Sequence, residues 1–461
     1  MKGTSQISRR RILRHAMLGI GGVALTDLLA RSQRKPATTR IPHFAPKAQR
    51  VIYIFLEGGL SQIDSYDRKP ALQAHHGKPL PDSIRPPKFT FAPQGTVIGS
   101  PFDWRQWGGN GTWASDLFPE VNRRFIDELC FIHSLQHESN DHLTAKTVLH
   151  TGVPREVRPT LGSWLMYGLG SENANLPGYI DIVPGRPQSR PTGFLPSIYG
   201  GTPIGKPDKK DPAHLWENLD SRFEGQEQHL DFIRALDGES EEEIENLELA
   251  FRMQTEAPEL MDLNRESKAT RDLYGIDEDH TDEFGRALLL ARRFSEAGVR
   301  YVTITHATPR YGNLWDQHSN LEKGHRGNAH AVDKPIAALL HDLDARGLLH
   351  DTLVMCGSEF GRTPTFEYFS GIDGKHTNGR DHNPHGFTMW FAGGAVKSGF
   401  HHGATDDFGY YAVEKPVSIH DLHATLLHIM GFDHEELTFL HGGRDFRLTD
   451  VYGKVVRPIL A

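Results

Sequence analysis

The residues of this chain that could do chemistry are its histidines, and they are unevenly distributed. The sequence holds 27 histidines, of which three lie between Thr151 and Thr305 and sixteen between His306 and His441. Neutral imidazole is the commonest metal ligand in proteins, and carboxylates complete sites for hard or borderline ions. Histidines that lie beside Asp, Glu and Arg are therefore the candidates for a metal site.

The first segment of interest runs from Glu57 to Asp64 and contains two glycines directly after Glu57. Glycine lets the backbone approach a ligand closely, but the same pair could simply form a tight turn between a strand and a helix. Under the first interpretation Glu57 is a candidate metal ligand, and Ser61 and Asp64 are candidate substrate-binding residues.

The second segment, Asn140 to Lys146, opens a predicted helix that ends before Thr151. The free N–H groups and the positive dipole end of a helix N-terminus suit an anion, which makes Asn140 a candidate substrate-binding residue. Asn140 or Asp141 could also be an ordinary helix cap.

The third segment contains Asp316-Gln317-His318, in which Asp-x-His places two kinds of metal ligand close together on a loop. The fourth is split between residues 357–364 and 378–386, and turn residues predict loops in both parts. Its candidate residues are Glu359, Arg362, Arg380, Asp381, His382 and His385. A single histidine is more often a hydrogen-bonded structural residue than a ligand, but the recurrence of these residue types after several strands predicts one shared site.

The elements that must position these segments alternate along the chain. Six apolar, β-branched runs predict buried strands, of the kind found in parallel sheets, at residues 51–56, 130–135, 179–183, 299–305, 352–356 and 387–391. Helical patterns lie at residues 143–150, 161–167, 284–297, 329–349 and 419–430. This alternation predicts an α/β fold with a mainly parallel central sheet and helices on both faces, in which ligands bind beyond the carboxyl ends of the strands.

Composition narrows the class of protein. The 461 residues carry a formal charge of −8, and the two cysteines cannot form a disulfide framework or a cysteine-rich zinc module. An acidic balance argues against nucleic acid as a partner. Residues 208–282 are acidic and lack strand patterns, so we expect a helical, partly solvated insertion there.

The N-terminus has the pattern of an export signal. Paired arginines in Ser8-Arg9-Arg10 precede a short apolar run from Ala16 to Thr26, which matches a twin-arginine signal and is too short for an ordinary membrane anchor. We expect a signal peptide at residues 1–30 and a linker at 31–47. Removing the first 30 residues leaves 46 basic and 58 acidic residues, a formal charge of −12.

Several motifs together resemble a known family. They are residues 55–64, 287–293, 297–301, 315–320, 358–364, 379–383, 421–427 and 443–447. With them, residues 48–461 resemble an exported bacterial domain-of-unknown-function family, family 1501, within the alkaline phosphatase/sulfatase superfamily. The resemblance implies one domain, a three-layer αβα sandwich that is alkaline-phosphatase-like, with metal ions beyond the strand ends.

The resemblance also implies roles for single residues, and several positions depart from the superfamily pattern. Glu57 stands where an Asp ligand is expected. His142 falls on the nucleophile position, which is Ser, Thr or formylglycine in the superfamily, and Lys146 falls on a basic catalytic position. Glu359-Phe360 stands where an Asp-His ligand pair is expected, so a second metal site lacks a ligand.

One metal site could still be assembled under this resemblance. Its ligands would be Asp316, His318 and His382, with Asp381 or His385 as further candidates. The ion would be divalent: zinc is expected first, with manganese or iron as alternatives, while calcium would need more oxygen ligands. In this scheme Arg362 and Lys146 neutralise developing charge, and His142 is a ligand, a general acid/base or a nucleophile.

These expectations lead to three hypotheses on function. The first is an exported metal-dependent hydrolase of phosphate or sulfate esters, acting on a small molecule or a polysaccharide in the periplasm or outside the cell. The second is a catalytically degenerate envelope protein that binds anionic polysaccharide, and the third is a metal-dependent phosphotransferase or mutase. In each case the expected partner for export is the twin-arginine translocase, with no nucleic acid and no stable membrane anchor.

Overall fold

The computed structural model describes residues 40–84, 94–155, 157–182, 191–204, 241–306, 315–367 and 378–461. The predicted signal peptide and most of the predicted linker lie outside these residues, as does the first part of the acidic insertion. Within the described residues, no helix combines the length and the apolar character needed to cross a membrane.

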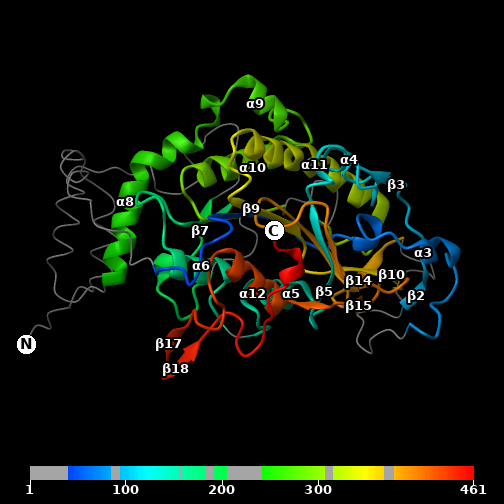
Figure 1. Ribbon diagram of the computed structural model, residues 1–461. Helices are drawn as coiled ribbons and strands as arrows, with labels where there is room; N and C mark the ends of the chain where they lie inside the picture. Colours follow the sequence, from blue (N-terminus) through cyan, green and yellow to red (C-terminus); the bar gives the residue numbers. More distant parts are fainter. Residues whose placement is uncertain are drawn as a thin grey trace, which may run out of the picture.

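A nine-stranded sheet forms the centre of the molecule (Figure 1). Its strands follow the order β13-β5-β12-β9-β1-β8-β6-β7, and β16 also pairs with β5. Their bounds are β1 Arg50–Phe55, β5 Cys130–Gln136, β6 Tyr179–Ile182, β7 Thr202–Ile204, β8 Tyr301–Thr305, β9 Thr352–Gly357, β12 Phe387–Ala392, β13 His401–His402 and β16 Val417–Ser418. All neighbouring strands are parallel except the two pairs that include β12, so the prediction of a mainly parallel sheet is confirmed.

The direction of β12 corrects the prediction of a parallel strand at residues 387–391. β12 pairs antiparallel with both β5 and β9. An apolar run buried on both faces gives its burial but not its direction. Parallel neighbours need a crossover connection, usually a helix, and the described residues between β9 and β12 form strands and no helix.

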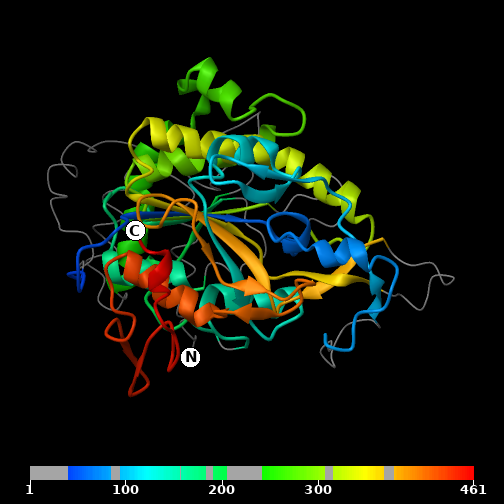
Figure 2. The ribbon, with the colours of Figure 1, turned by 45° about the vertical axis from the view of Figure 1, so that its right-hand side comes forward.

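Helices cover both faces of this sheet, which gives the three layers expected (Figure 2). The helices α4 (Pro119–Phe125), α10 (Asp282–Glu296) and α11 (Leu321–Ala345) pack on one face, and α5 (His142–Thr151), α6 (Leu161–Leu169) and α12 (Ile419–Ile429) pack on the other. The side chains of β1 alternate between the two cores: Ile52 and Ile54 join the first, and Val51, Tyr53 and Phe55 join the second.

The remaining helices are α3 (Pro70–Ala74), α8 (Glu241–Met261) and α9 (Lys268–Leu273), with 3-10 turns η1 (Gln62–Asp64), η3 (Ser197–Tyr199), η5 (Leu263–Arg265) and η6 (Arg457–Ile459). The described part of the acidic insertion is thus helical. The helix α11 begins eight residues before its predicted start, because the polar residues and the glycine of its first turns, such as Gly324 and Asn328, hide the apolar period.

A second, smaller sheet corrects the prediction of loops at residues 357–364 and 378–386. It joins β11 (Arg380–Asn383), β10 (Gly361–Glu367) and β2 (Gln94–Val97), with Arg362 opposite His382. Gly361 and Pro364 suggested turns, but Pro364 lies where the register of the ribbon shifts, a place where a strand tolerates proline. Three further ribbons join β3 (Trp104–Trp107) to β4 (Thr112–Ser115), β14 (Ala404–Thr405) to β15 (Ala412–Glu414), and β17 (Phe439–His441) to β18 (Arg444–Phe446).

Candidate metal centre

The fold brings the predicted segments together at one end of the central sheet. Glu57 and Glu359 follow β1 and β9, His142 opens the helix after β5, and Asp316 and His318 follow β8. These strands run in the same direction, so their carboxyl ends meet at one edge of the sheet. His382 comes from β11 of the small sheet.

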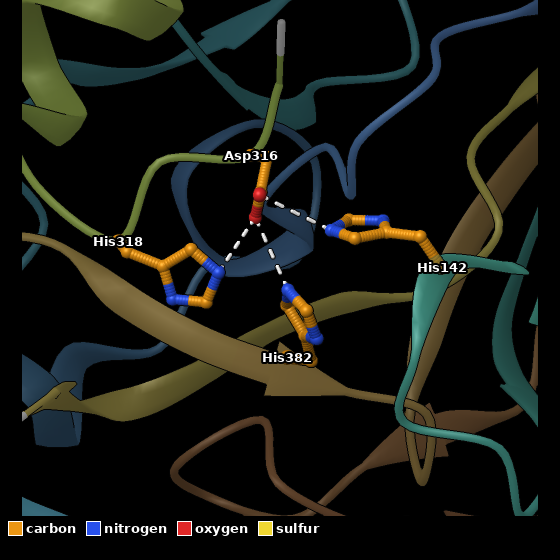
Figure 3. Close-up of side chains that lie close together, drawn as sticks. All are labelled: His142, Asp316, His318 and His382. Carbon is orange, nitrogen blue, oxygen red and sulfur yellow. Dashed lines mark hydrogen bonds and ion pairs between the residues drawn. The ribbon is translucent and has the colours of Figure 1, made fainter. Parts of the chain in front are cut away.

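Four of these side chains form a compact cluster. His142, Asp316, His318 and His382 each offer one ligand atom, and these atoms all lie within 4.8 Å of one another. Figure 3 shows the three imidazole rings pointing at the carboxylate of Asp316. Its Oδ1 lies 2.8 Å from Nε2 of His318 and 3.1 Å from Nε2 of His382, and its Oδ2 lies 3.2 Å from Nε2 of His142.

The other nitrogen of each ring is bound by an acceptor. Nδ1 of His142 lies 2.6 Å from Oε1 of Glu359, Nδ1 of His318 contacts the carboxylate of Glu367, and Nδ1 of His382 lies 2.6 Å from the carbonyl of Asn140. Carboxylates and carbonyls only accept, so each Nδ1 carries the proton. In the neutral ring the lone pair is then on Nε2 and points to the centre, as in metal-binding histidines.

The carboxylate of Asp316 is held in place by the guanidinium of Arg362. The guanidinium of Arg362 is fully buried, and its Nη2 donates to Oδ1 of Asp316 at 2.7 Å. Nε donates to the carbonyl of Gly59 at 2.9 Å and Nη1 to that of Arg380 at 3.1 Å, while Nη2 also donates to the carbonyl of Trp315 at 3.2 Å. Arg362 was predicted to neutralise developing charge, but these contacts leave it facing Asp316 and the backbone.

The charges of the cluster are strongly coupled. Burial by itself would raise the pKa of Asp316, but its contacts with the three histidines and Arg362 lower it well below its usual value. Burial would lower the pKa of His318, but Asp316 and Glu367 raise it to about 9. In the same way Asp316 and Glu359 raise the pKa of His142. For His382 burial dominates and lowers the pKa to about 4.

Glu359, predicted as a metal ligand, supports the cluster instead of entering it. Its carboxylate is fully buried and accepts from the amide of Gly58 at 3.0 and 3.1 Å, from Oγ of Ser358 at 2.9 Å and from His142. Gly58 has φ of +120°, and a Cβ there would lie 2.7 Å from the backbone nitrogen of Asp316. The glycine after Glu57 therefore serves the close approach of two backbone segments.

Glu57 and Lys146 form a pair beside the cluster. Nζ of Lys146 lies 2.5 Å from Oε1 of Glu57, and Lys146 is buried. Lys146 lies one helical turn after His142, so both side chains leave the same side of α5. Asp141 caps this helix by accepting from the amide of Thr144 at 2.9 Å, which confirms the predicted cap.

Three of the candidate substrate-binding residues lie in a buried network. Asp64 and Arg380 are fully buried and joined by bonds of 2.8 and 3.2 Å, and Oγ of Ser61 donates to Asp64 at 2.5 Å. Arg380 also donates to the carbonyls of Thr363 and Ile98. This network ties η1 to the small sheet. The fourth candidate, Asn140, contributes its carbonyl to His382.

Two further predicted ligands take other positions. Asp381 is buried and accepts from the amide of His382 at 2.7 Å, and burial raises its pKa to about 6. It forms a second group with His318 and Glu367. His385 lies against Tyr411, with ring centroids 5.5 Å apart, and belongs to neither group.

Glu367 was not among the predicted site residues. No histidine stands beside it in the sequence, and its only signal is its position three residues after Pro364 in the ribbon. Phe360, at the place where a histidine ligand was expected, packs on the rings of His142 and His382 with centroids 4.9 and 4.4 Å apart. It thus forms an apolar wall of the cluster.

Residues 48–460 match a protein family described as a protein of unknown function, DUF1501. The chain belongs to the DUF1501 family. This confirms the family named from the motifs. No curated protein matches this DUF1501 chain.

The solved structures that are similar to this DUF1501 protein share little sequence with it. They include the PsFucS1 sulfatase from Pseudoalteromonas sp., 13% identical, covering 93% of this chain and 73% of that chain with a TM-score of 0.37. A protein in the alkaline phosphatase superfamily from Vibrio parahaemolyticus is 10% identical, with coverage of 86% and 69% and a TM-score of 0.37. The phosphonate monoester hydrolase SpPMH from Silicibacter pomeroyi is 13% identical, with coverage of 74% and 71% and a TM-score of 0.31.

Proposed function

We propose that this DUF1501 protein is a metal-dependent hydrolase of phosphate or sulfate esters. One observation carries the proposal. Three Nε2 atoms and one carboxylate converge within 4.8 Å, while acceptors fix the Nδ1 atom of every ring. This arrangement orients imidazole lone pairs toward one point, which is the geometry that holds a metal ion.

The balance of buried charge favours a divalent ion in the metal-loaded state. Asp316, Glu359, Glu367 and Asp381 bring four carboxylates to the cluster and its supports, against the guanidinium of Arg362. Buried carboxylates need positive charge nearby, and neutral histidines supply no positive charge. A divalent cation at the centre would offset two of the excess negative charges. The donor set of three imidazoles and one carboxylate suits zinc, manganese or iron, and we expect zinc first.

A bound divalent ion would supply Lewis acidity to an ester oxygen and lower the pKa of an attacking water. The chain's own part is to orient His142, Asp316, His318 and His382 through Glu359, Arg362, Glu367 and the carbonyl of Asn140. Lys146, paired with Glu57, places a positive charge one helical turn from His142. In the proposed reaction it stabilises developing negative charge.

Water is the proposed nucleophile. The residue at the start of α5 is His142, which is not a hydroxyl nucleophile. Ser61 and Ser358, two serines near the cluster, use their hydroxyl hydrogens in other bonds. Ser61 donates to Asp64, and the single hydroxyl hydrogen of Ser358 is shared between the carbonyl of Leu56 at 2.5 Å and the carboxylate of Glu359 at 2.9 Å. A formylglycine route needs a modifiable Cys or Ser at the start of α5, so the proposed mechanism does without it. His142 can act as a ligand or as a general acid/base.

The test combines metal analysis with an activity panel. Purified full-length protein would be analysed for bound Zn, Mn, Fe and Ca and assayed on phosphate monoesters, phosphate diesters and sulfate esters. We expect one ion per chain and turnover that a chelator abolishes and the metal restores. The variant Asp316→Ala should lose the bound ion and the turnover, while Asp272→Ala, on exposed α9, should keep the bound ion and the turnover. Absence of bound ion together with absence of turnover would overturn the proposal.

One observation favours a second candidate function, an envelope protein that binds anionic polysaccharide without catalysis. Phe360 replaces an expected ligand and packs on two of the histidines. This candidate predicts binding of sulfated or phosphorylated polysaccharide that survives both His142→Ala and Asp316→Ala. The hydrolase predicts that ligand binding weakens in both variants, so titration calorimetry separates the two.

Export by the twin-arginine pathway is part of the proposal and rests on the sequence from Ser8 to Thr26. The test is cell fractionation of the full chain. Replacing Arg9 and Arg10 by Lys should retain the protein in the cytoplasm. Replacing Arg14 by Lys is the matched control and should leave export unchanged.

A further inference from the structure

We infer that Glu367 is a positioning residue that holds the ring of His318 so that its Nε2 faces the metal centre. This inference rests on the proposed metal site. Glu367 is the last residue of β10, its side chain is buried, and its Oε2 contacts Nδ1 of His318.

His318 needs such a support more than the other two histidines do. His142 belongs to α5 and His382 to β11, but His318 lies in the segment between β8 and α11, outside any helix or strand. The side chain of His318 is 25% exposed. A ring on such a segment has rotamer freedom that a bond from Nδ1 removes. A carboxylate acceptor also fixes the tautomer and makes Nε2 a more basic ligand.

The ribbon of β10 and β11 fixes the main chain of the same segment. The amide of Arg380 donates to the carbonyl of Gln317 at 3.1 Å, and Oδ1 of Asn378 accepts from the amide of Asn320 at 2.6 Å. Gly379 packs so closely that a Cβ there would lie 2.2 Å from the carbonyl carbon of His318. The amide of Glu367 in turn donates to the carbonyl of Gly379 at 3.3 Å.

Backbone and ring of His318 are therefore held by one structural unit. The ribbon clamps the main chain on both sides of His318, and Glu367 connects the ribbon to the imidazole. Glu359 plays the corresponding part for His142, but it also accepts from the amide of Gly58, so its replacement would disturb the backbone at Gly58 as well as the ring. The carboxylate of Glu367 contacts the ring of His318, so ring orientation is tested at this position.

The test measures metal affinity in purified full-length protein by competition with a chelator, using Zn²⁺ and Mn²⁺. We expect Glu367→Gln to weaken affinity about 10- to 100-fold, the range found when outer-shell partners are removed. Glu414→Gln, an exposed glutamate on β15, is the control and should bind as the wild type does. Thermal unfolding of the metal-free variants shows whether each one folds.

A double-mutant cycle separates positioning from a general structural effect. If Glu367 acts through the ring of His318, then Glu367→Gln added to His318→Ala should weaken affinity no further. Additive losses would overturn the inference, and so would wild-type affinity in Glu367→Gln. The inference would also be wrong if the wild type binds two ions and Glu367→Ala binds one. Glu367 would then be a metal ligand itself, in a second site with His318 and Asp381.

A second measurement keeps this inference separate from the proposed function. In metal-free protein with ¹⁵N-labelled histidine, NMR should show a protonated Nδ1 on His318 with a strongly hydrogen-bonded proton signal. Glu367→Gln should shift or remove that signal. If the wild type binds no ion, the proposed function is wrong, but the NMR experiment still tests the role of Glu367. If the wild type lacks the hydrogen-bonded proton signal of His318, the inference on Glu367 is wrong.

Discussion

The histidines of this chain differ by their partners. His325 and His423 are fully buried, and burial lowers the pKa of each to about 3, so they are neutral structural residues. Nε2 of His325 accepts from the amide of Ser61, and Nε2 of His423 contacts the carbonyl of Leu149. His318 has carboxylates on both nitrogens. A carboxylate at Nε2, and not burial, marks the metal candidates: Asp316 faces that nitrogen of His142, His318 and His382.

The buried pair of Asp64 and Arg380 leads to a prediction on stability. Asp64→Asn would leave a fully buried guanidinium without its counter-charge, so we expect a loss of about 3–5 kcal/mol in the free energy of unfolding. Urea unfolding measures it. The control is Asp272→Asn, which breaks the exposed pair with Lys268 and should cost less than about 1 kcal/mol. Equal losses in both variants would contradict a structural role for the buried pair.

At the scale of elements, the site depends on contacts between segments far apart in the sequence. The turn after β1 packs against residues 315–316, the start of α5 faces the residues after β9, and the ribbon of β10 and β11 clamps the segment after β8. The four donors therefore come from three parts of the chain: His142 from α5, His382 from β11, and both Asp316 and His318 from the segment between β8 and α11. Closely packed glycines mark two of these contacts.

Gly58 allows this dependence to be tested. Gly58→Ala places a Cβ 2.7 Å from the nitrogen of Asp316 and puts an L-residue at positive φ, so we expect both stability and metal affinity to fall. Gly347→Ala is the control, because Gly347 also has positive φ (+69°) but no atom lies within 4 Å of its Cβ position. It should lose about 1–2 kcal/mol of stability and keep its metal affinity. Unchanged metal affinity in Gly58→Ala would show that the two segments need not touch.

At the scale of the whole molecule, the sheet separates two cores, and the site lies at the strand ends between them. A ligand that binds only the folded state stabilises the whole protein by mass action. With zinc at 100 times its dissociation constant, we expect about 2.7 kcal/mol of added stability, measured as a concentration-dependent rise of the thermal midpoint. Asp316→Ala should show no rise, and an equal rise in that variant would place the ion elsewhere.

Buried histidines set the response of the fold to acid. Among the described residues outside the metal cluster, burial lowers the pKa of six histidines to about 3–4: His133, His137, His150, His306, His325 and His423. Below the unfolded value of about 6.5 the unfolded chain binds more protons than the folded one, so stability falls as pH drops from 6.5 toward 4. Each histidine contributes a slope of up to about 1.4 kcal/mol per pH unit.

Urea unfolding between pH 4 and 7 measures this slope. His325→Gln should reduce this slope by up to about 1.4 kcal/mol per pH unit, because one titrating group is removed. A wild-type stability that does not change between pH 5 and 6.5 would contradict the prediction.

Most of the sheet and its helices could be predicted from the sequence, because burial of apolar side chains leaves a local pattern. The runs at residues 51–56 and 352–356 became β1 and β9 within one residue at each end. The direction of β12 could not be predicted, since an apolar strand buried on both faces looks the same in either direction. The strands β10 and β11 were missed because glycine and proline suggested turns.

The sequence by itself determined which residue types were available for a metal site, and it placed His142, Asp316 and His318 after predicted strands. Only the tertiary structure decided which of them meet. It assembled His382 with the other three, assigned Glu359 and Glu367 to orient rings, and buried Arg362, Asp64 and Arg380 as supports. The physical reason is that a ligand is defined by the direction of its lone pair, and that direction depends on hydrogen-bond partners up to about 240 residues away in the chain.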